Sequence, residues 1–142
     1  MSDARTQKQY AALPWHRRAD GALEVMLITS RDTGRWVIPK GWPVSGLSPS
    51  NSAAHEAREE GGIVGRVGDQ AIGRYHYNKG MPDKSSVPCA VDVFALEVER
   101  QLKSWPERKE RRTQWFLPEE AAAAVDEPEL AALIRDLPKR LA

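Results

Sequence analysis

The chain is poor in cysteine and has no long apolar run. Cys89 is the one cysteine among 142 residues, so neither a disulfide framework nor a structural metal is expected. A chain of this length buries about two-thirds of the surface that its unfolded form exposes, which suffices for a core. Charged residues interrupt the apolar stretches well before the roughly 20 residues that a membrane-spanning helix needs. We therefore expect a single domain over residues 1–142, with no membrane partner.

The sequence also has almost no excess of charge of either sign. Lys and Arg total 21 and Asp and Glu total 20, a formal net charge of +1. This balance argues against a general nucleic-acid coat and against a polybasic membrane anchor, whereas a local cluster of charge could still attract a compact anion. The polar residues 1–10 predict no secretory signal. We expect a cytoplasmic protein whose partner is not a nucleic acid.

The first half of the chain contains signals for strands, then a shaped loop, then a helix. Residues 10–18 and 23–30 predict a hairpin around Asp20-Gly21, and residues 35–38 a short strand. An irregular loop is predicted next because breakers recur there, at Pro39, Gly41, Pro43 and Gly46. Ser48 then suits a helix N-cap, Pro49 suits the first helical position, and Gly61-Gly62 would end the helix.

The second half predicts strands followed by helices. The expected elements are two long antiparallel strands at 63–77 and 87–98, a charge-dense loop at 103–112, a strand at 113–117, a helix from Pro118, and a last helix after Asp126 to Pro128 that ends near Leu137. Core spacing in the last helix, at Leu130, Leu133, Ile134 and Leu137, predicts packing against the sheet. This order predicts an α+β fold, an α/β/α sandwich on a mixed sheet.

Three carboxylates share one face of the central helix. Glu56, Glu59 and Glu60 stand at positions i, i+3 and i+4, where side chains are neighbours. Like charges at this spacing cost a few tenths of a kcal/mol per pair, roughly, in an exposed helix. A cation is therefore expected beside them, and Mg²⁺ suits carboxylates that share an ion with substrate phosphates. For the triplet taken alone, a solvated helix face is the alternative.

The segment PKGWPVSGLSPSNSAAHEAREEGGI, residues 39–63, resembles the signature of the Nudix hydrolases. That signature is Gly, five residues, Glu, seven residues, Arg-Glu, an aliphatic residue, any residue, Glu-Glu, any residue, Gly and an aliphatic residue. The chain matches it at Gly41, Glu56, Ala57, Glu59-Glu60 and Gly62-Ile63. Two positions differ, because Leu47 replaces the first Glu and His55 replaces the Arg.

The resemblance extends from Tyr10 to about Leu137. WVIPKGWP and RRTQWFLPEEAAAAV look like the branch that contains diphosphoinositol polyphosphate and diadenosine polyphosphate phosphohydrolases. It implies a Nudix-type sandwich with the loop and helix at about 41–63, Mg²⁺ or Mn²⁺ as cofactor, and attack of water on the diphosphate of a small polyphosphorylated substrate. The alternatives are an RNA 5′-end pyrophosphohydrolase and a binding module that has lost catalysis, and a homodimer is compatible with each.

Motif position implies a role for each carboxylate. Glu56 and Glu60 would bind the metal directly, Glu59 directly or through water, and a backbone carbonyl near Lys40-Gly41 would complete the site. The general base would be a carboxylate of the motif, Glu56 or Glu59, or Glu107 from the 103–112 loop. In this family the Glu and Arg that Leu47 and His55 replace mostly orient the metal-binding carboxylates. Their replacement suggests that this support is altered while the metal ligands are retained. His55 would either donate a hydrogen bond to Glu59 or pack.

Basic residues from segments expected to border the motif are candidate substrate contacts. Those assigned to substrate binding are Arg17, Arg35, Lys40, His76, Lys103, Arg108 and Arg111, and their neighbours Arg18, Lys79, Lys109 and Arg112 belong to the same group. If such residues cluster, the entrance of the site would carry positive charge although the net charge of the chain is close to zero. Trp42 could stack on a base, whereas Trp36 alternates within a strand and is predicted in the core.

Overall fold

The computed structural model describes residues 5–142. Within that range the strands are β1 (Gln7–Arg17), β2 (Leu23–Thr29), β3 (Trp36–Val37), β4 (Lys40–Gly41), β5 (Ile63–Val67), β6 (Gly73–Gly80), β7 (Ser86–Gln101) and β8 (Thr113–Phe116). The helices are α1 (Pro49–Gly61), α2 (Pro118–Ala124) and α3 (Pro128–Arg140). None of these helices is both long and apolar enough to cross a bilayer.

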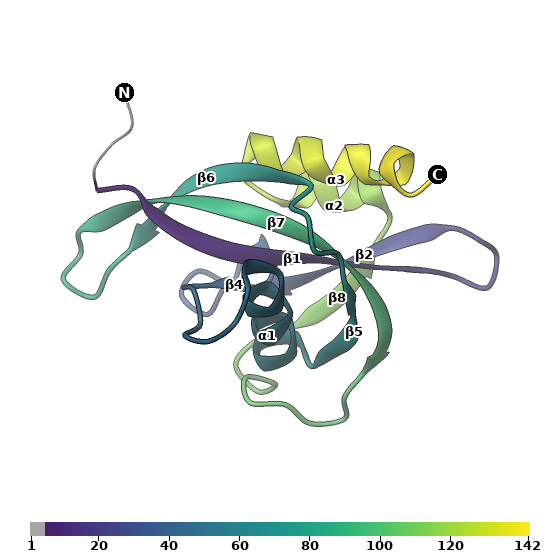
Figure 1. The fold of residues 1–142 in the computed structure, drawn as a ribbon, viewed down its shortest axis with the longest axis horizontal. Coiled ribbons are helices and arrows are strands. Elements are labelled where there is room, and N and C mark those ends of the chain that lie inside the picture. The colour runs from purple at the N-terminus through teal and green to yellow at the C-terminus, as the bar shows by residue number, and fades with distance from the viewer. Residues whose placement is uncertain (1–4) are drawn as a thin grey trace.

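The strands form a mixed sheet around a parallel central pair. The order is β3-β2-β1-β7-β5, with β4 beside β1, β6 beside β7 and β8 beside β2. β1 and β7 run parallel, with Gln7 opposite Cys89 and Trp15 opposite Glu97, whereas β1 and β2 form the predicted antiparallel hairpin. Figure 1 shows β1 and β7 crossing the middle of the molecule.

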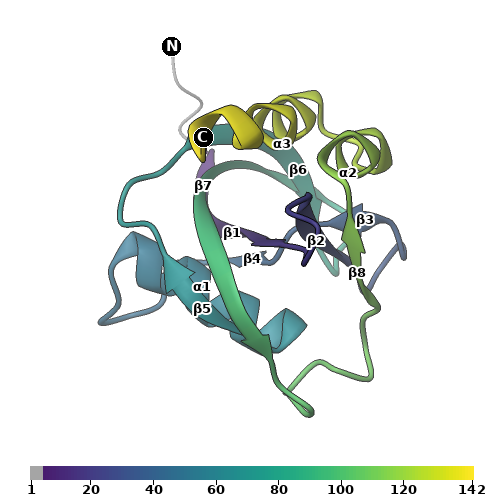
Figure 2. The same ribbon diagram turned by 90° about the vertical axis from the view of Figure 1, so that its right-hand side faces the viewer.

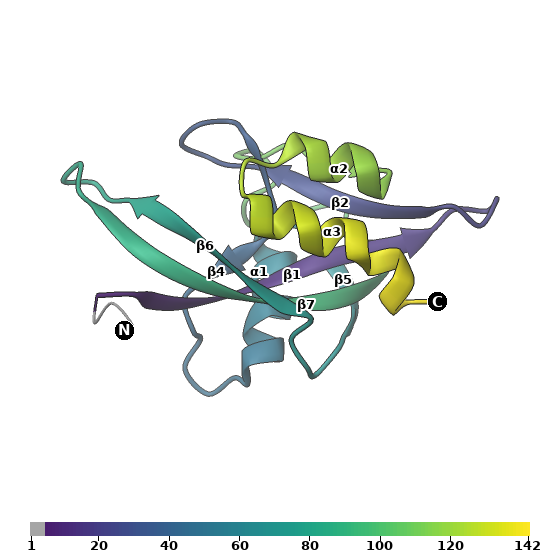
Figure 3. The same ribbon diagram turned by 90° about the horizontal axis from the view of Figure 1, so that it is seen from above.

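Helices cover both faces of this sheet. α1 lies on one face, and α2 and α3 lie together on the other (Figures 1 and 2). Seen from above, α2 lies over β2 and α3 crosses β1 (Figure 3). The predicted α/β/α sandwich is therefore confirmed.

Alternation along the central strands explains why two cores form. Ala11 and Leu13 pack into the cluster beneath α2 and α3, with Leu130, Ile134 and Leu137, so the predicted packing of the last helix is confirmed. Ala12, between them in sequence, packs with Ala53 and Ala57 on the α1 side. Successive side chains of a strand point to opposite faces, so a strand buried on both faces carries a continuous apolar run.

One predicted strand is two strands in the structure. Residues 63–77 were expected to be continuous, but β5 ends at Val67 and β6 begins at Gly73. Both pair antiparallel with β7, as predicted. The prediction of a single strand is wrong because Gly68 and Asp69 favour a turn, which interrupts the pairing with β7. The amides of Gly68 and Ile72 still donate to the carbonyls of Ala95 and Val93.

The ends of α1 are fixed as the sequence predicts. The Ser48 hydroxyl accepts from the backbone N–H of Asn51 at 3.2 Å, and Pro49 is the first helical residue. Gly62 closes the helix with a φ of +66°, in the left-handed region that glycine tolerates. The ring of Trp105, from the loop after β7, packs on this glycine so closely that a Cβ atom there would collide with it.

Replacing Gly62 with alanine should therefore destabilise the fold by two effects. The left-handed backbone alone costs about 1–2 kcal/mol for an L-residue, and displacing the Trp105 ring should add about 1–3 kcal/mol. Gly21→Ala is the matched control, because Gly21 has a φ of +86° and open space around its Cβ position. Urea unfolding should show a clearly larger loss for Gly62→Ala. Equal losses would contradict the packing of Trp105 on Gly62.

Candidate metal and substrate site

A cavity of about 520 Å³ lies where α1, β4 and the loop between β7 and β8 meet. Carboxylates and cations line it together, including Glu56, Glu60, Glu107, Lys40 and Arg111. A smaller cavity of about 250 Å³ shares Lys40, Tyr77 and Lys79 with the first and extends to Arg35. The two cavities therefore form one polar depression with α1 at one end.

α1 places its three carboxylates in different surroundings. Glu60 is only 7% exposed, and its Oε1 accepts from the backbone N–H of Lys40 at 3.2 Å. Glu56 is half-buried and lies against Gly41, where a Cβ would collide with its carboxyl group. Glu59 is outside the cavity lining, and its Oε1 is 3.6 Å from His55 Nε2. That distance is an ion-pair contact and is too long for a hydrogen bond.

Burial shifts the protonation of the groups that line the cavity. Desolvation raises the pKa of Glu60, although Arg111 and Lys40 oppose this effect. Desolvation also raises the pKa of Glu56 and lowers the pKa of Lys40, where Glu60 opposes it. Burial thus disfavours the charged forms on both sides of the site. A cation bound between the carboxylates would offset this cost.

The donor set fits a hard divalent ion in an open site. Across residues 5–142, no three His, Cys, Asp or Glu side chains converge into a closed metal cage. Mg²⁺ does not need such a cage, because it commonly binds one or two carboxylates and keeps positions for water and substrate phosphates. Glu56 and Glu60 line one cavity beside the main chain of Gly41. Glycine there allows the main chain to approach closely.

The loop between β7 and β8 brings a fourth carboxylate and an arginine to the cavity. The backbone N–H of Glu107 donates to the carbonyl of Glu59 at 3.1 Å, which satisfies a carbonyl that the end of α1 leaves unpaired. Arg111 Nε then donates to Glu107 Oε1 at 2.8 Å. Glu107 therefore lines the same cavity as Glu56 and Glu60.

Three of the proposed substrate contacts lie at the two cavities. Lys40 and Arg111 line the larger cavity, and the Lys40 ammonium lies 5.1 Å from the centre of the Tyr77 ring. Arg35 lines the smaller cavity, but its Nη2 is already 2.8 Å from Glu127 Oε2 at the start of α3.

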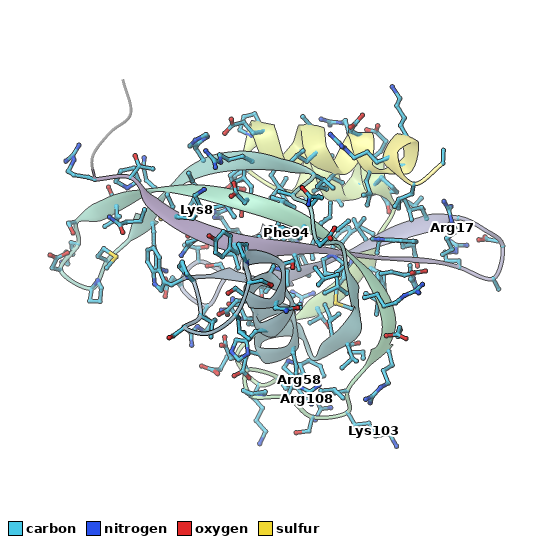
Figure 4. All side chains as sticks on the ribbon, in the orientation of Figure 1. Lys8, Arg17, Arg58, Phe94, Lys103 and Arg108 are labelled. Atoms are coloured by element: carbon cyan, nitrogen blue, oxygen red, sulfur yellow. The ribbon has the colours of Figure 1, made fainter. Side chains whose placement is uncertain are left out.

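The other four lie outside the lining of both cavities. The Arg17 guanidinium donates to Gly21 O in the β1–β2 hairpin, and the backbone N–H and ring of His76 contact Glu129 on α3. Figure 4 shows Arg17 towards the hairpin tip and Lys103 and Arg108 at the lower edge of the molecule.

Sequence reasoning did not single out part of the lining. Gln9, Ser30, Arg31 and Asp32 border the larger cavity, as does Tyr77, whose hydroxyl donates to Gln9 Oε1 at 2.6 Å. The position of residues 30–32, directly after β2 and before the loop at 39–46, is the sequence feature that could have indicated their place at the cavity. Trp42 lies on the rim and is 40% exposed.

The fold and the site together define a class: an α+β sandwich in which a loop and the capped helix that follows it direct glutamates into a cavity that basic side chains also line. The chain belongs to the NUDIX domain family, whose model matches residues 8–137. The family and the fold predicted from the motif are therefore confirmed.

Several curated relatives are similar over part of their length. "Nudix hydrolase 12, mitochondrial" of Arabidopsis thaliana is 31% identical over 102 residues, which cover 70% of this chain and 50% of that protein. "Diphosphoinositol polyphosphate phosphohydrolase 3-alpha" of Mus musculus is 29% identical over 107 residues, 73% of this chain and 61% of that protein. The chain spans 50% to 60% of the length of three Arabidopsis relatives.

Solved structures share the fold at low identity. An Ap4A hydrolase of C. elegans superposes with a TM-score of 0.72 at 20% identity, over 96% of this chain and 99% of that one. The NUDIX domain of Shewanella oneidensis NrtR, solved with ADP ribose, gives a TM-score of 0.71 at 14% identity, over 96% and 89%.

The contact between Gly41 and Glu56 predicts that Gly41→Ala weakens metal binding while the fold persists. The added Cβ would displace the carboxyl group of Glu56, the flexible end of a side chain. Binding of Mn²⁺, measured by electron paramagnetic resonance, should weaken by about 10-fold or more. The control is Gly68→Ala, where the nearest atom is at an ordinary contact distance of 3.7 Å. Unchanged Mn²⁺ binding in Gly41→Ala would remove Glu56 from the ligand set.

Proposed function

We propose that the chain hydrolyses a diphosphate linkage in a small, polyphosphorylated metabolite, with Mg²⁺ or Mn²⁺ as cofactor. The observation that carries this proposal is the pairing of Glu56 and Glu60 in one cavity with Lys40, Lys79 and Arg111. Carboxylates that can hold a cation, beside basic groups that can hold anions, match the needs of a diphosphate. The names of the similar proteins, which include diphosphoinositol polyphosphate phosphohydrolases and an Ap4A hydrolase, support the same substrate class.

Each group would have a separate task in the reaction. Glu56 and Glu60 hold the ion, and Glu59 assists through water because its carboxylate faces His55 outside the cavity. An ion held there would neutralise charge on the phosphate oxygens. Lys40 and Lys79, which line both cavities, would orient the substrate. The protein thus supplies positioning and charge, which are the main requirements of transfer at phosphorus.

Glu107 is our candidate for the base that accepts the proton of the attacking water. It lines the cavity with the metal-binding pair, whereas Glu59 does not. Arg111 and Arg31 both contact its Oε1, so Oε2 is the oxygen that would take the proton. Glu56 remains the alternative within the motif.

Two features bear on the choice of substrate. Trp42 exposes its ring on the rim of the cavity, where it could stack on the base of a dinucleoside polyphosphate. The lysines and arginines of the depression suit a diphosphoinositol polyphosphate, which has no base. An RNA 5′ end is the second candidate, because Lys103 and Arg108 lie outside the lining of both cavities, at the lower edge of the molecule in Figure 4, where they could contact a longer phosphate chain.

Phosphate release with and without Mg²⁺ tests the function. The panel holds diphosphoinositol polyphosphates, diadenosine polyphosphates, nucleoside diphosphate sugars and 5′-triphosphorylated RNA. Turnover of one of the first two should require the metal and fall by about 100-fold or more in Glu60→Gln, because a metal ligand is lost. Glu99→Gln, which changes an exposed carboxylate on β7, should retain full activity.

Two results would contradict the proposal. Turnover of the RNA alone, with binding that weakens steeply as salt rises, would favour the RNA 5′ end. Binding of a panel member without any turnover would make the chain a binding module that has lost catalysis.

A further inference from the structure

The motif helix lacks the arginine that its signature includes, and an arginine from a distant loop contacts one carboxylate of the motif, Glu60. His55 stands at the arginine position, is 41% exposed, and contacts Glu59. Arg111, in contrast, has its Nη2 at 3.5 Å from Oε2 of Glu60, the buried carboxylate of the helix. The cation beside Glu60 therefore comes from outside α1.

Arg111 is held on three sides. Its side chain is only 9% exposed. Nε donates to Glu107 Oε1 at 2.8 Å, and Nη1 donates to the carbonyl of Thr29, at the end of β2, at 3.0 Å. With Nη2 facing Glu60, each nitrogen of the guanidinium has a protein partner. A planar guanidinium fixed in this way cannot rotate towards a substrate. It instead holds its carboxylate partners in one orientation.

Charge explains why this orientation matters. Glu56, Glu60 and Glu107 line one cavity, and like charges that close repel. Arg111 touches both Glu60 and Glu107, so it offsets the repulsion between α1 and the loop. Glu107 also has backbone hydrogen bonds to Glu59 and from Glu110, and Arg31, whose side chain is half exposed, lies 3.7 Å from its carboxylate. Those contacts hold the loop but leave the carboxylate less constrained.

We propose that Arg111 is a positioning residue that holds the Glu107 carboxylate beside Glu60. This inference deepens the proposed function, on which it rests, because it assigns Arg111 to the orientation of the candidate base and not to contact with the substrate.

The kinetic test compares Arg111→Met with Arg111→Lys. In Arg111→Met, kcat should fall by about 10–100-fold, the usual loss for a partner that orients a ligand, while KM changes by less than about threefold. Arg111→Lys keeps the charge but not the planar fork, so its kcat should be intermediate. The matched control is Arg66→Met, which removes an exposed arginine paired with Glu97 across the sheet and should leave kcat unchanged.

Combination with Glu107→Gln decides whether Arg111 acts through that carboxylate. If it does, the double variant Arg111→Met with Glu107→Gln should be no slower than Glu107→Gln alone. Losses that multiply would show that the two residues act independently, and a rise in KM at constant kcat would make Arg111 a substrate contact. Either result overturns the inference and leaves the proposed function standing.

Thermal unfolding without metal gives a readout that does not depend on turnover. Arg111→Met should lower Tm, because it leaves two carboxylates without their cation, and the added Glu107→Gln should restore part of the loss. A further fall in Tm in the double variant would overturn the inference. If the wild type hydrolyses no member of the panel, the proposed function fails, and this experiment still decides whether Arg111 and Glu107 form one unit. If Arg111→Met does not fold, Arg111→Lys carries both tests.

Discussion

The structure of the site depends on one constraint: a carboxylate carried into the interior must be matched by positive charge or by hydrogen-bond donors. Glu60 meets this constraint with donors from two elements that are distant in sequence, the backbone of Lys40 in β4 and the guanidinium of Arg111. These two contacts bring β4 and the loop at 102–112 to the C-terminal end of α1. The cavity is the space that these segments enclose, and its mixed charge follows from their meeting.

Close approach of backbone and side chain makes this meeting possible. Glu56 can lie on Gly41 and Trp105 can lie on Gly62 only because both positions lack a Cβ. The first contact aims a carboxylate, and the second anchors the loop that carries Glu107. Two glycines of the motif thus control the placement of groups beside α1, although neither has a functional side chain.

Features set by local sequence could be predicted, and features set by distant pairing could not. Ser48, Pro49 and Gly62 bound α1 through contacts within a few residues, and the spacing of Glu56, Glu59 and Glu60 identified the helix that faces the site. The contact of Arg111 with Glu60 and the separation of Glu59 from the cavity arise from the packing of a loop whose path has no periodic signal. Basic character alone likewise could not separate Lys40, at the cavity, from Arg17, whose guanidinium bonds within its own hairpin.

The parallel pair at the centre of the sheet has a consequence for how the chain acquires its structure. β1 leaves the ribosome well before its partner β7, because the two strands are far apart in the sequence, with Gln7 opposite Cys89. Both apolar clusters contain side chains from these two strands, so neither can be completed until β7 has been synthesised. Contacts between such distant segments close a long loop and slow folding. The nascent chain should therefore expose the apolar faces of β1 and β2 until β7 has been synthesised, and chaperones would have the most apolar surface to bind in that period.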